Sequence, residues 1–322
     1  MKNKTESTTR DMLLKEFEAS LSQQDHSALT IKGYLSDIQS FSTWFENENH
    51  EPFALERVTP IDMKKYKTFL METRRQKANT INRKLASLSA LMHWALENGK
   101  IQSDPMQHIK VVRSSGPSPK WLDKHAQFAL QRAIEKDLQL SKLRFPKRWV
   151  TRQRDASLTI FMLHTGLRLN ECTKLHLNDV TLSERKGTVL VQNGKGGRQR
   201  SVPLNSHARS AIEDWLKVRP AGQRSRDQRG DDYLWVAVEA DEVNGLTGRS
   251  VQRVLKRYAQ EAGLEQLTPH ILRHSFAKNL INSGVGLEKV AVLLGHSSLN
   301  TTRIYITPDS RDLELAVEQL EG

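Results

Sequence analysis

The sequence predicts a mainly α-helical protein of two domains, the second of which also contains a small three-stranded antiparallel sheet. Apolar residues recur at helical spacing through most of the 322 residues, which favours helices with one buried face. Short runs typical of strands gather between residues 179 and 204. Residues 113–120 are rich in Ser, Pro and Gly, which is typical of a linker. We therefore predict one domain over residues 1–112 and a second over residues 121–322.

The first domain is expected to be a small helical bundle. Thr59, followed by Pro60 and Asp62, predicts the start of a third helix, because a threonine cap and a first-turn proline favour initiation. Thr80 is expected to open a fourth helix that Gly99 ends. The residues expected to face the core are Met12, Leu13, Phe17 and Leu21, then Leu35, Ile38, Phe41 and Phe45, then Tyr66, Phe69 and Leu70, and finally Ile81, Leu85, Leu88, Met92 and Ala95.

The second domain combines further helices with the sheet. A helical pattern over residues 121–138 is followed by a basic run, 142–154, which can contact a polyanion or form a solvated loop; we favour the loop. Strands are expected at residues 179–182, 187–192 and 198–204, the last two joined by a glycine-rich turn at 193–197. Helices are expected at residues 155–164, from 206 onward, and at 248–262, 268–283, 287–294 and 300–305.

The composition favours a polyanionic partner. Lys and Arg total 49 against 37 Asp and Glu, a formal net charge of +12, which makes nucleic acid the first candidate and a merely soluble basic protein the alternative. The single cysteine, Cys172, excludes an intramolecular disulfide framework and a cysteine-rich zinc site, and we interpret it as a buried apolar residue. The polar N-terminus predicts no secretory signal, and no apolar run is long enough for a membrane span. We expect a soluble, cytoplasmic protein.

Two clusters in the second domain carry residues suited to phosphodiester chemistry. One is Thr165-Gly166-Leu167-Arg168-Leu169-Asn170-Glu171, and the other is Pro269-His270-Ile271-Leu272-Arg273-His274, followed by Gly295-His296 and Tyr305. Without metal ions, attack on a phosphodiester needs protein cations to neutralise the phosphate oxygens. Arg168 and Arg273 suit this role because a guanidinium donates two hydrogen bonds to phosphate. The sequence shows no clustered carboxylates for a two-metal site, so we expect neither metal nor cofactor.

The remaining polar residues of these clusters suggest acid–base roles. His270 and Arg273, three residues apart, share one helix face, where His270 can bind the phosphate and accept a tyrosine proton. Tyr305 is the candidate nucleophile, and Glu171 is expected to orient the cations. Metal binding by His270 and His274 is an alternative that we disfavour because no carboxylate motif accompanies them, and we interpret His274 as structural. Taken one at a time, these residues also allow a purely structural role, with Arg168 as a helix cap, His270 as a core histidine and Tyr305 as a ring packed on a helix face.

In this order, T-G-L-R-x-x-E, H-x-L-R-H-S-F-A, L-G-H-S and Tyr305 resemble the tyrosine recombinases, the phage-integrase family. The resemblance implies that Tyr305 is the nucleophile and that His296 holds a phosphate oxygen. The segment G-K-G-G-R-x-R is similar to the hairpin whose lysine acts as general acid in the family, which implies that role for Lys195.

The resemblance also assigns the domains. It implies that residues 1–112 form the core-binding, DNA-binding domain and residues 121–322 the catalytic domain. The segment T-I-N-R-K-L-A-S-L-S-A-L resembles the DNA-facing helix of the first, and the basic helix 248–262 can enter a groove; for both, a solvated face is the alternative. The candidate DNA-contacting residues are Asn79, Thr80, Arg83, Lys84, Arg249, Gln252 and Arg253, with Lys256 on the same face as the last three.

By this resemblance we expect a site-specific DNA recombinase that cleaves and rejoins DNA through a 3′-phosphotyrosyl intermediate and a Holliday junction. The expected partners are double-stranded DNA with paired binding sites and a homotetramer in the synapse, from a monomer or dimer when free. An apolar stripe at Leu313, Ala316, Val317 and Leu320 is expected to dock in a neighbouring subunit.

The short segment before the first helix leads us to expect no arm-binding domain, which suggests a resolvase or transposon-borne enzyme acting on the bacterial nucleoid. A type IB topoisomerase and a non-catalytic, sequence-specific DNA-binding protein are the alternatives, and the complete catalytic set argues against the second.

Overall fold

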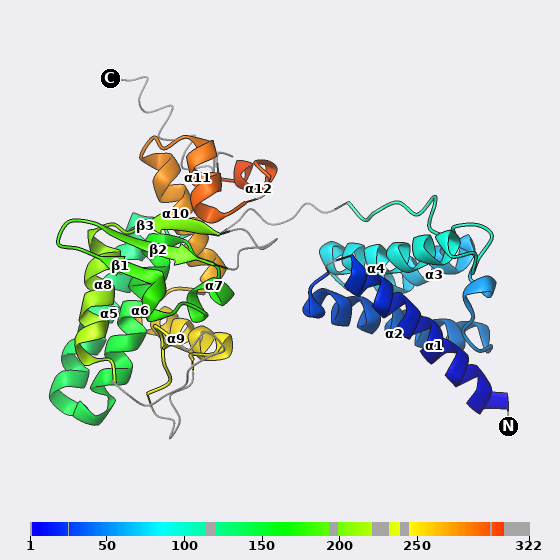
Figure 1. The fold of residues 1–322 in the computed structure, drawn as a ribbon, viewed down its shortest axis with the longest axis horizontal. Helices are drawn as coiled ribbons and strands as arrows, with labels where there is room; N and C mark the ends of the chain where they lie inside the picture. The colour runs from blue at the N-terminus through cyan, green and yellow to red at the C-terminus, as the bar shows by residue number, and fades with distance from the viewer. Residues whose placement is uncertain are drawn as a thin grey trace. The chain divides into compact units, whose positions relative to one another are not determined.

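The computed structural model describes residues 2–24, 26–113, 120–192, 199–220, 232–238, 245–296 and 298–305. The chain divides into two compact units, Met1–Gly116 and Pro117–Gly322, each built around its own apolar core (Figure 1). The predicted fold class is confirmed, because the chain is mainly helical with one small three-stranded antiparallel sheet among the described residues. Most of the predicted linker, residues 114–119, lies outside the described residues.

The N-terminal unit is a helical bundle with an aromatic core. The Tyr66 ring lies 5.0 Å from the rings of both Phe41 and Trp44, measured between centroids. Such aromatic pairs add to the stabilisation that comes from burying their area. The helices are α1 (Lys2–Gln23), α2 (Ala28–Asn49), the short η1 (Leu55–Arg57), α3 (Pro60–Thr68), the π-helical η2 (Phe69–Thr73) and α4 (Ala78–Glu97).

The helix-start and core predictions for this unit are mostly confirmed. The Thr59 backbone N–H donates to Asp62 Oδ2 at 2.9 Å and the Asp62 backbone N–H to Thr59 Oγ1 at 3.3 Å, which forms the capping box. The predicted start of α4 at Thr80 is wrong, since the Thr80 backbone N–H already bonds to the Lys77 carbonyl at 2.9 Å. Met12 was expected in the core, but its side chain is exposed. Of the other expected core residues, Leu13, Leu35 and Phe69 are partly buried and the rest are buried.

The C-terminal unit surrounds the long helix α6. This helix packs against α5, α8, α9 and α10, so most of its faces are buried. The sheet has the order β1-β2-β3, with both pairs antiparallel and Val189 opposite both Val180 and Val202. The elements are α5 (Lys124–Arg144), η3 (Pro146–Arg148), α6 (Trp149–Thr165), α7 (Leu169–Thr173), η4 (Leu177–Asp179), β1 (Val180–Leu182), β2 (Gly187–Val191), β3 (Arg200–Pro203), α8 (Ser206–Val218), α9 (Gly248–Glu261), α10 (Pro269–Asn282), α11 (Leu287–Leu294) and α12 (Asn300–Arg303).

The interpretation of residues 142–154 as a solvated loop is wrong. The segment contains the last turn of α5, the whole of η3 and the beginning of α6. Its backbone stays hydrogen-bonded through the break, since the Phe145 N–H donates to the Ser141 carbonyl at 3.0 Å and the Arg148 N–H to the Phe145 carbonyl at 2.8 Å. The charged side chains therefore project from ordered helical backbone, which fixes their directions.

The end of α6 requires glycine for two reasons. Gly166 has φ +61, and a Cβ atom there would lie 2.4 Å from Cδ1 of Phe276 on α10. After the sharp turn at Gly166, α7 begins at Leu169 and carries Glu171. Close packing of α10 on this turn therefore depends on the missing side chain.

We predict that Gly166→Ala destabilises the C-terminal unit by about 3 kcal/mol, because left-handed strain and overpacking add. Gly263→Ala is the matched control, since Gly263 has φ +66 but nothing within 4 Å of the added Cβ, and it should lose only about 1 kcal/mol. Urea unfolding followed by tryptophan fluorescence measures both losses. Equal losses in the two variants would contradict the packing argument.

Candidate active site

Three arginines from distant segments converge on the C-terminal end of α11. Arg200 Nε donates to the Leu293 carbonyl at 3.1 Å, Arg273 Nη2 to the Leu294 carbonyl at 2.6 Å, and Arg168 Nη2 to the Gly295 carbonyl at 2.8 Å. The last carbonyls of a helix lack partners within the helix and carry the negative end of its dipole. Cations are therefore well placed here, and α11 determines where the three guanidinium groups lie.

The Glu171 carboxylate ties two of these arginines together. Arg168 Nη1 donates to Oε1 at 2.8 Å, while Arg200 Nη1 and Nη2 donate to Oε1 and Oε2 at 2.9 and 2.8 Å. Burial alone would raise the pKa of Glu171, but the hydrogen bonds and charges of Arg200 and Arg168 outweigh it and lower the pKa to about 2. The carboxylate is therefore ionised at neutral pH and orients the cations, the role that the sequence suggested.

Arg273 is held from both sides and is buried. Its Nη1 donates to the Gly166 carbonyl at 2.7 Å, and its Nη2 to α11 as described. Burial, helped by the Arg168 charge, lowers the pKa of Arg273 to about 10, so the group stays protonated at neutral pH. A guanidinium has five N–H donors, and the backbone takes two of those on Arg273. Three remain to bind an anion.

Tyr305 is buried with its hydroxyl against a histidine. Its Oη lies 2.7 Å from His274 Nδ1, and the residue is 1% exposed, packed with Ala277, Val290 and Leu294. Burial raises the pKa of Tyr305, although the Arg273 and Arg168 charges oppose it. Burial also lowers the pKa of His274 to about 4, with the His270 and Arg273 charges adding to the effect. At neutral pH a protonated phenol thus meets a neutral imidazole.

The other two histidines lie near this pair. His296 Nδ1 is 2.8 Å from Thr302 Oγ1, and its ring stacks on Tyr305 at 6.5 Å between centroids and 11° between planes. Burial, then the charges of Arg273 and Arg168, lower the pKa of His296 to about 4. His270 is exposed, with its ring 6.3 Å from the His274 ring. Histidine therefore reaches the phenol oxygen from position 274 rather than 270.

The structure brings together most of the residues that the sequence selected. Arg168, Glu171, Arg273, His296 and Tyr305 lie in one constellation on α7, α10, α11 and the segments beside them. Lys195, the expected general acid, lies outside the described residues, as does the expected apolar stripe of the C-terminal tail.

Sequence reasoning missed two members of the site. Arg200 belongs to the quoted G-K-G-G-R-x-R segment, and its position two residues before buried Val202 on β3 indicates that it faces inward. His274 was interpreted as structural, yet it contacts the Tyr305 hydroxyl. His274 directly follows Arg273 in the sequence, and this position does not indicate a contact with Tyr305, which lies 31 residues later.

The candidate DNA-contacting residues lie on two helix faces. Arg83 on α4 pairs with buried Asp37, Nη2 to Oδ1 at 2.9 Å, and Lys84 Nζ donates to Ser40 Oγ at 3.2 Å, so both are partly engaged within the unit; Asn79 is exposed and Thr80 half-buried. On α9, three residues at helical spacing are exposed on one face together with Lys256; they are Arg249, Gln252 and Arg253.

Among the described residues, no group of three or more His, Cys, Asp or Glu side chains is placed to hold a metal ion. Nor does any helix in that part of the chain combine the length and hydrophobicity that a membrane crossing requires. Cys172 is fully buried, and burial raises the pKa of its thiol. It therefore fills the core beside the site, as the sequence suggested.

Comparison with known proteins identifies the family. Residues 139–311 match the model of the phage integrase family, and residues 14–99 match that of the phage integrase N-terminal SAM-like domain. The chain belongs to the phage integrase family of tyrosine recombinases. It is therefore an enzyme that cleaves and rejoins DNA in site-specific recombination.

Individual relatives of this recombinase cover most of its length. Tyrosine recombinase XerC of Syntrophus aciditrophicus is 31% identical over 92% of both chains, and tyrosine recombinase XerD of Ralstonia nicotianae is 31% identical over 86% of this chain and 82% of its own. The solved XerH recombinase, bound to a palindromic difH substrate in a post-cleavage complex, superimposes with a TM-score of 0.73 at 25% identity, covering 95% of this chain and 85% of that one.

We predict that Glu171→Gln destabilises the C-terminal unit by about 3 kcal/mol at neutral pH, because it leaves two arginines without their shared carboxylate. The folded pKa of about 2 lies below the ordinary 4.5, so Glu171 stabilises the fold above pH 4.5, and this contribution fades as the pH falls toward 2. Urea unfolding of both proteins across that range measures the difference. A difference that does not change with pH would contradict this account.

Proposed function

We propose that Tyr305 of this recombinase attacks a DNA phosphate and forms a 3′-phosphotyrosyl intermediate, which a 5′ hydroxyl of the partner duplex resolves through a Holliday junction. The observation that carries the proposal is the Tyr305 hydroxyl, 2.7 Å from His274 and beside the guanidinium cluster. A phenol is a weak nucleophile at neutral pH, so it needs a proton acceptor and nearby positive charge. The site supplies both.

Arg168 and Arg273 bind the scissile phosphate in this proposal. Each uses two of its N–H groups on Glu171 or backbone carbonyls, which leaves three donors on each guanidinium for the phosphate oxygens. His296 holds a further oxygen. Lys195 protonates the leaving 5′ oxygen, a role that rests on the family resemblance of its hairpin.

His274 takes the tyrosine proton. Because its pKa is about 4, the imidazole is neutral at neutral pH, and in the tautomer that carries its proton on Nε2 the Nδ1 atom accepts the hydrogen bond that the Tyr305 hydroxyl donates. The sequence assigned this role to His270, which is exposed and turned toward His274 rather than bonded to the phenol. His270 is then free to bind the phosphate from the solvent side.

The domain roles and the assembly complete the proposal. Residues 1–112 form the core-binding domain, with α4 toward DNA, and residues 121–322 form the catalytic domain, with α9 as a second DNA contact. Four copies assemble on two paired sites, because two duplexes must be cut and exchanged. The XerH complex with its difH substrate supports DNA as the partner.

We predict that Tyr305→Phe abolishes covalent attachment to DNA while site binding stays within about twofold, because the loss of one hydroxyl leaves the phosphate contacts intact. The assay is trapping on a nicked suicide substrate, with gel shifts on one and two sites as the control for binding and assembly. A denaturant-resistant adduct at a 3′ end with the Phe variant would exclude Tyr305 as the nucleophile.

We predict that His274→Asn lowers the cleavage rate by about 100-fold, because asparagine can accept the hydrogen bond but not the proton. His270→Asn is the matched control and should retain more activity, since that residue lies one helical turn farther from the phenol. Single-turnover cleavage at saturating protein measures both rates. The reverse order of the two losses would return the proton-accepting role to His270.

A further inference from the structure

A second cationic site lies in the C-terminal unit, apart from the arginine cluster at α11. The end of η3, the beginning of α6, residues 237, 238 and 246, and α9 line a cavity of about 610 Å³. Five guanidinium groups and one carboxylate line it, from Arg148, Arg152, Arg154, Arg253, Arg257 and Asp155. This charge composition favours an anionic ligand.

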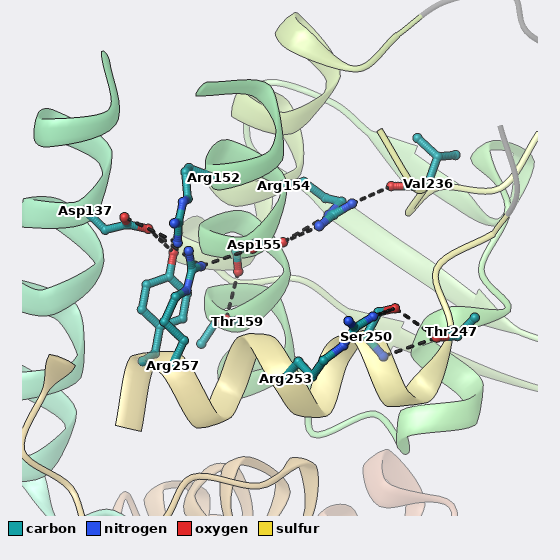
Figure 2. A network of polar contacts seen from close by, with 11 residues as sticks. Asp137, Arg152, Arg154, Asp155, Thr159, Val236, Thr247, Ser250, Arg253 and Arg257 are labelled. Atoms are coloured by element: carbon teal, nitrogen blue, oxygen red, sulfur yellow. Dashed lines mark hydrogen bonds and ion pairs between the residues drawn. The ribbon is translucent and has the colours of Figure 1, made fainter. Parts of the chain in front are cut away.

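The floor of the cavity is an ion-pair network, drawn in Figure 2. Arg154 Nη2 donates to Asp155 Oδ1 at 2.6 Å, and Arg257 Nη2 donates to Asp155 Oδ2 at 3.0 Å. Asp137 on α5 lies 3.6 Å from Arg152 Nη1 and 3.7 Å from Arg257 Nη2. Three arginines thus share two carboxylates, so the network keeps a positive charge and holds its donors in place.

The other two arginines add charge that is not neutralised locally. Within the described part of the chain, Arg148 and Arg253 have no carboxylate partner; Arg253 donates instead to Ser250 Oγ at 3.2 Å. Arg148 is exposed at the end of η3, and Arg253 is exposed on α9. Both therefore face the cavity from its solvent side with their charges available.

Two buried polar atoms of the cavity's side chains have no hydrogen-bond partner in the part of the chain that the structure describes. Four buried side-chain N or O atoms in the described residues have no hydrogen-bond partner, and two of them, Thr151 Oγ1 and Arg152 Nη1, belong to residues that line this cavity. A buried donor without an acceptor costs about 1–3 kcal/mol, so such atoms are rare without a reason. Within that part of the chain, Thr151 Oγ1 has no partner and Arg152 Nη1 has only its ion pair with Asp137 at 3.6 Å, so both side chains have hydrogen-bonding capacity left for an oxygen-rich anion.

We propose that this cavity binds a backbone phosphate of the DNA duplex on which α9 lies. Guanidinium groups and hydroxyls are the usual ligands of phosphate oxygens. DNA is favoured as the source because Arg253 belongs both to the cavity and to the exposed face of α9 that carries Arg249, Gln252 and Lys256. The inference rests on the DNA binding of the proposed function, and it gives Arg148, Arg152 and Arg154 of the basic segment a role.

The first test compares two exposed arginines of that segment. Arg148→Gln removes a guanidinium from the cavity, and Arg144→Gln removes one from the end of α5 that does not line it. The DNA is a duplex that carries the recombination site of this protein. Arg148→Gln should lower the affinity for this duplex about tenfold and reduce the slope of log affinity against log salt concentration by about one. Arg144→Gln should leave the slope and the cleavage activity at wild-type values.

Equal slopes for wild type and Arg148→Gln would overturn the inference. Arg152→Gln, which removes a guanidinium whose Nη1 has only the ion pair with Asp137 among the described residues, repeats the test on the cavity floor, with thermal unfolding confirming that the variant is folded. Failure of the proposed function would give a different result, because the wild-type protein itself would then not bind or cleave the duplex.

The second test identifies the phosphate. Each backbone phosphate of the duplex is replaced in turn by an uncharged methylphosphonate. One position should weaken the wild-type protein about tenfold but leave Arg148→Gln unaffected, because the two changes remove the same contact. Identical losses in both proteins at every position would overturn the inference. Tight binding of inorganic pyrophosphate or a free nucleotide, lost in Arg148→Gln without any change in DNA slope, would overturn DNA as the source.

Discussion

The shared carboxylate of Glu171 is the interaction on which the site depends. Arg168, Arg200 and Arg273 place three positive charges close together in a partly buried volume, where their repulsion is weakly screened. Glu171 and the last carbonyls of α11 supply the compensating negative charge. Removing either source of negative charge would leave like charges facing one another. The cluster therefore persists only while α7, β3 and α11 keep their positions relative to one another.

The relative positions of these elements follow from the glycines that end α6 and α11. Gly166 ends α6 so that α7 begins at once, and Gly295 ends α11 with φ +65. A Cβ atom on Gly295 would lie 2.8 Å from Arg200 Nη1, so glycine lets the guanidinium approach the end of the helix. The arginines are therefore held in position by the protein itself, so the proposed binding of a phosphate requires little reorganisation.

The sequence predicted features that depend on local chemistry. Helical periodicity, the Thr59–Asp62 cap and the bounds of α11 were correct because near neighbours in the chain determine them. Arg168 and Arg273 were selected because a guanidinium suits phosphate chemistry, and both side chains meet the end of α11, while their role in binding phosphate stays a prediction. Arg200 was missed because its partner Glu171 lies on another element, and no spacing pattern reveals a pairing across the fold.

Two other discrepancies have the same physical origin. His270 and His274 lie one turn apart on the same side of α10, so the choice between them depends on which turn Tyr305 meets, and this depends on where α12 brings the chain. The charged segment 142–154 looked like a loop because its composition is polar, but hydrogen bonds at Phe145 and Arg148 and contacts with α5 and α9 keep it helical. Composition alone does not report such contacts, and the role of Lys195 stays a prediction.

The burial of Tyr305 has a consequence for when this recombinase can cut. A ring that is 1% exposed must leave its apolar neighbours before its hydroxyl can reach a DNA phosphate, as the proposed attack requires. The observed cleavage rate is then the intrinsic rate multiplied by the fraction of molecules in which the phenol is released. Any interaction that stabilises the released form therefore raises the activity. A protein that meets random DNA far more often than its own site gains fidelity from such latency, because in a chance encounter the proposed nucleophile is still buried.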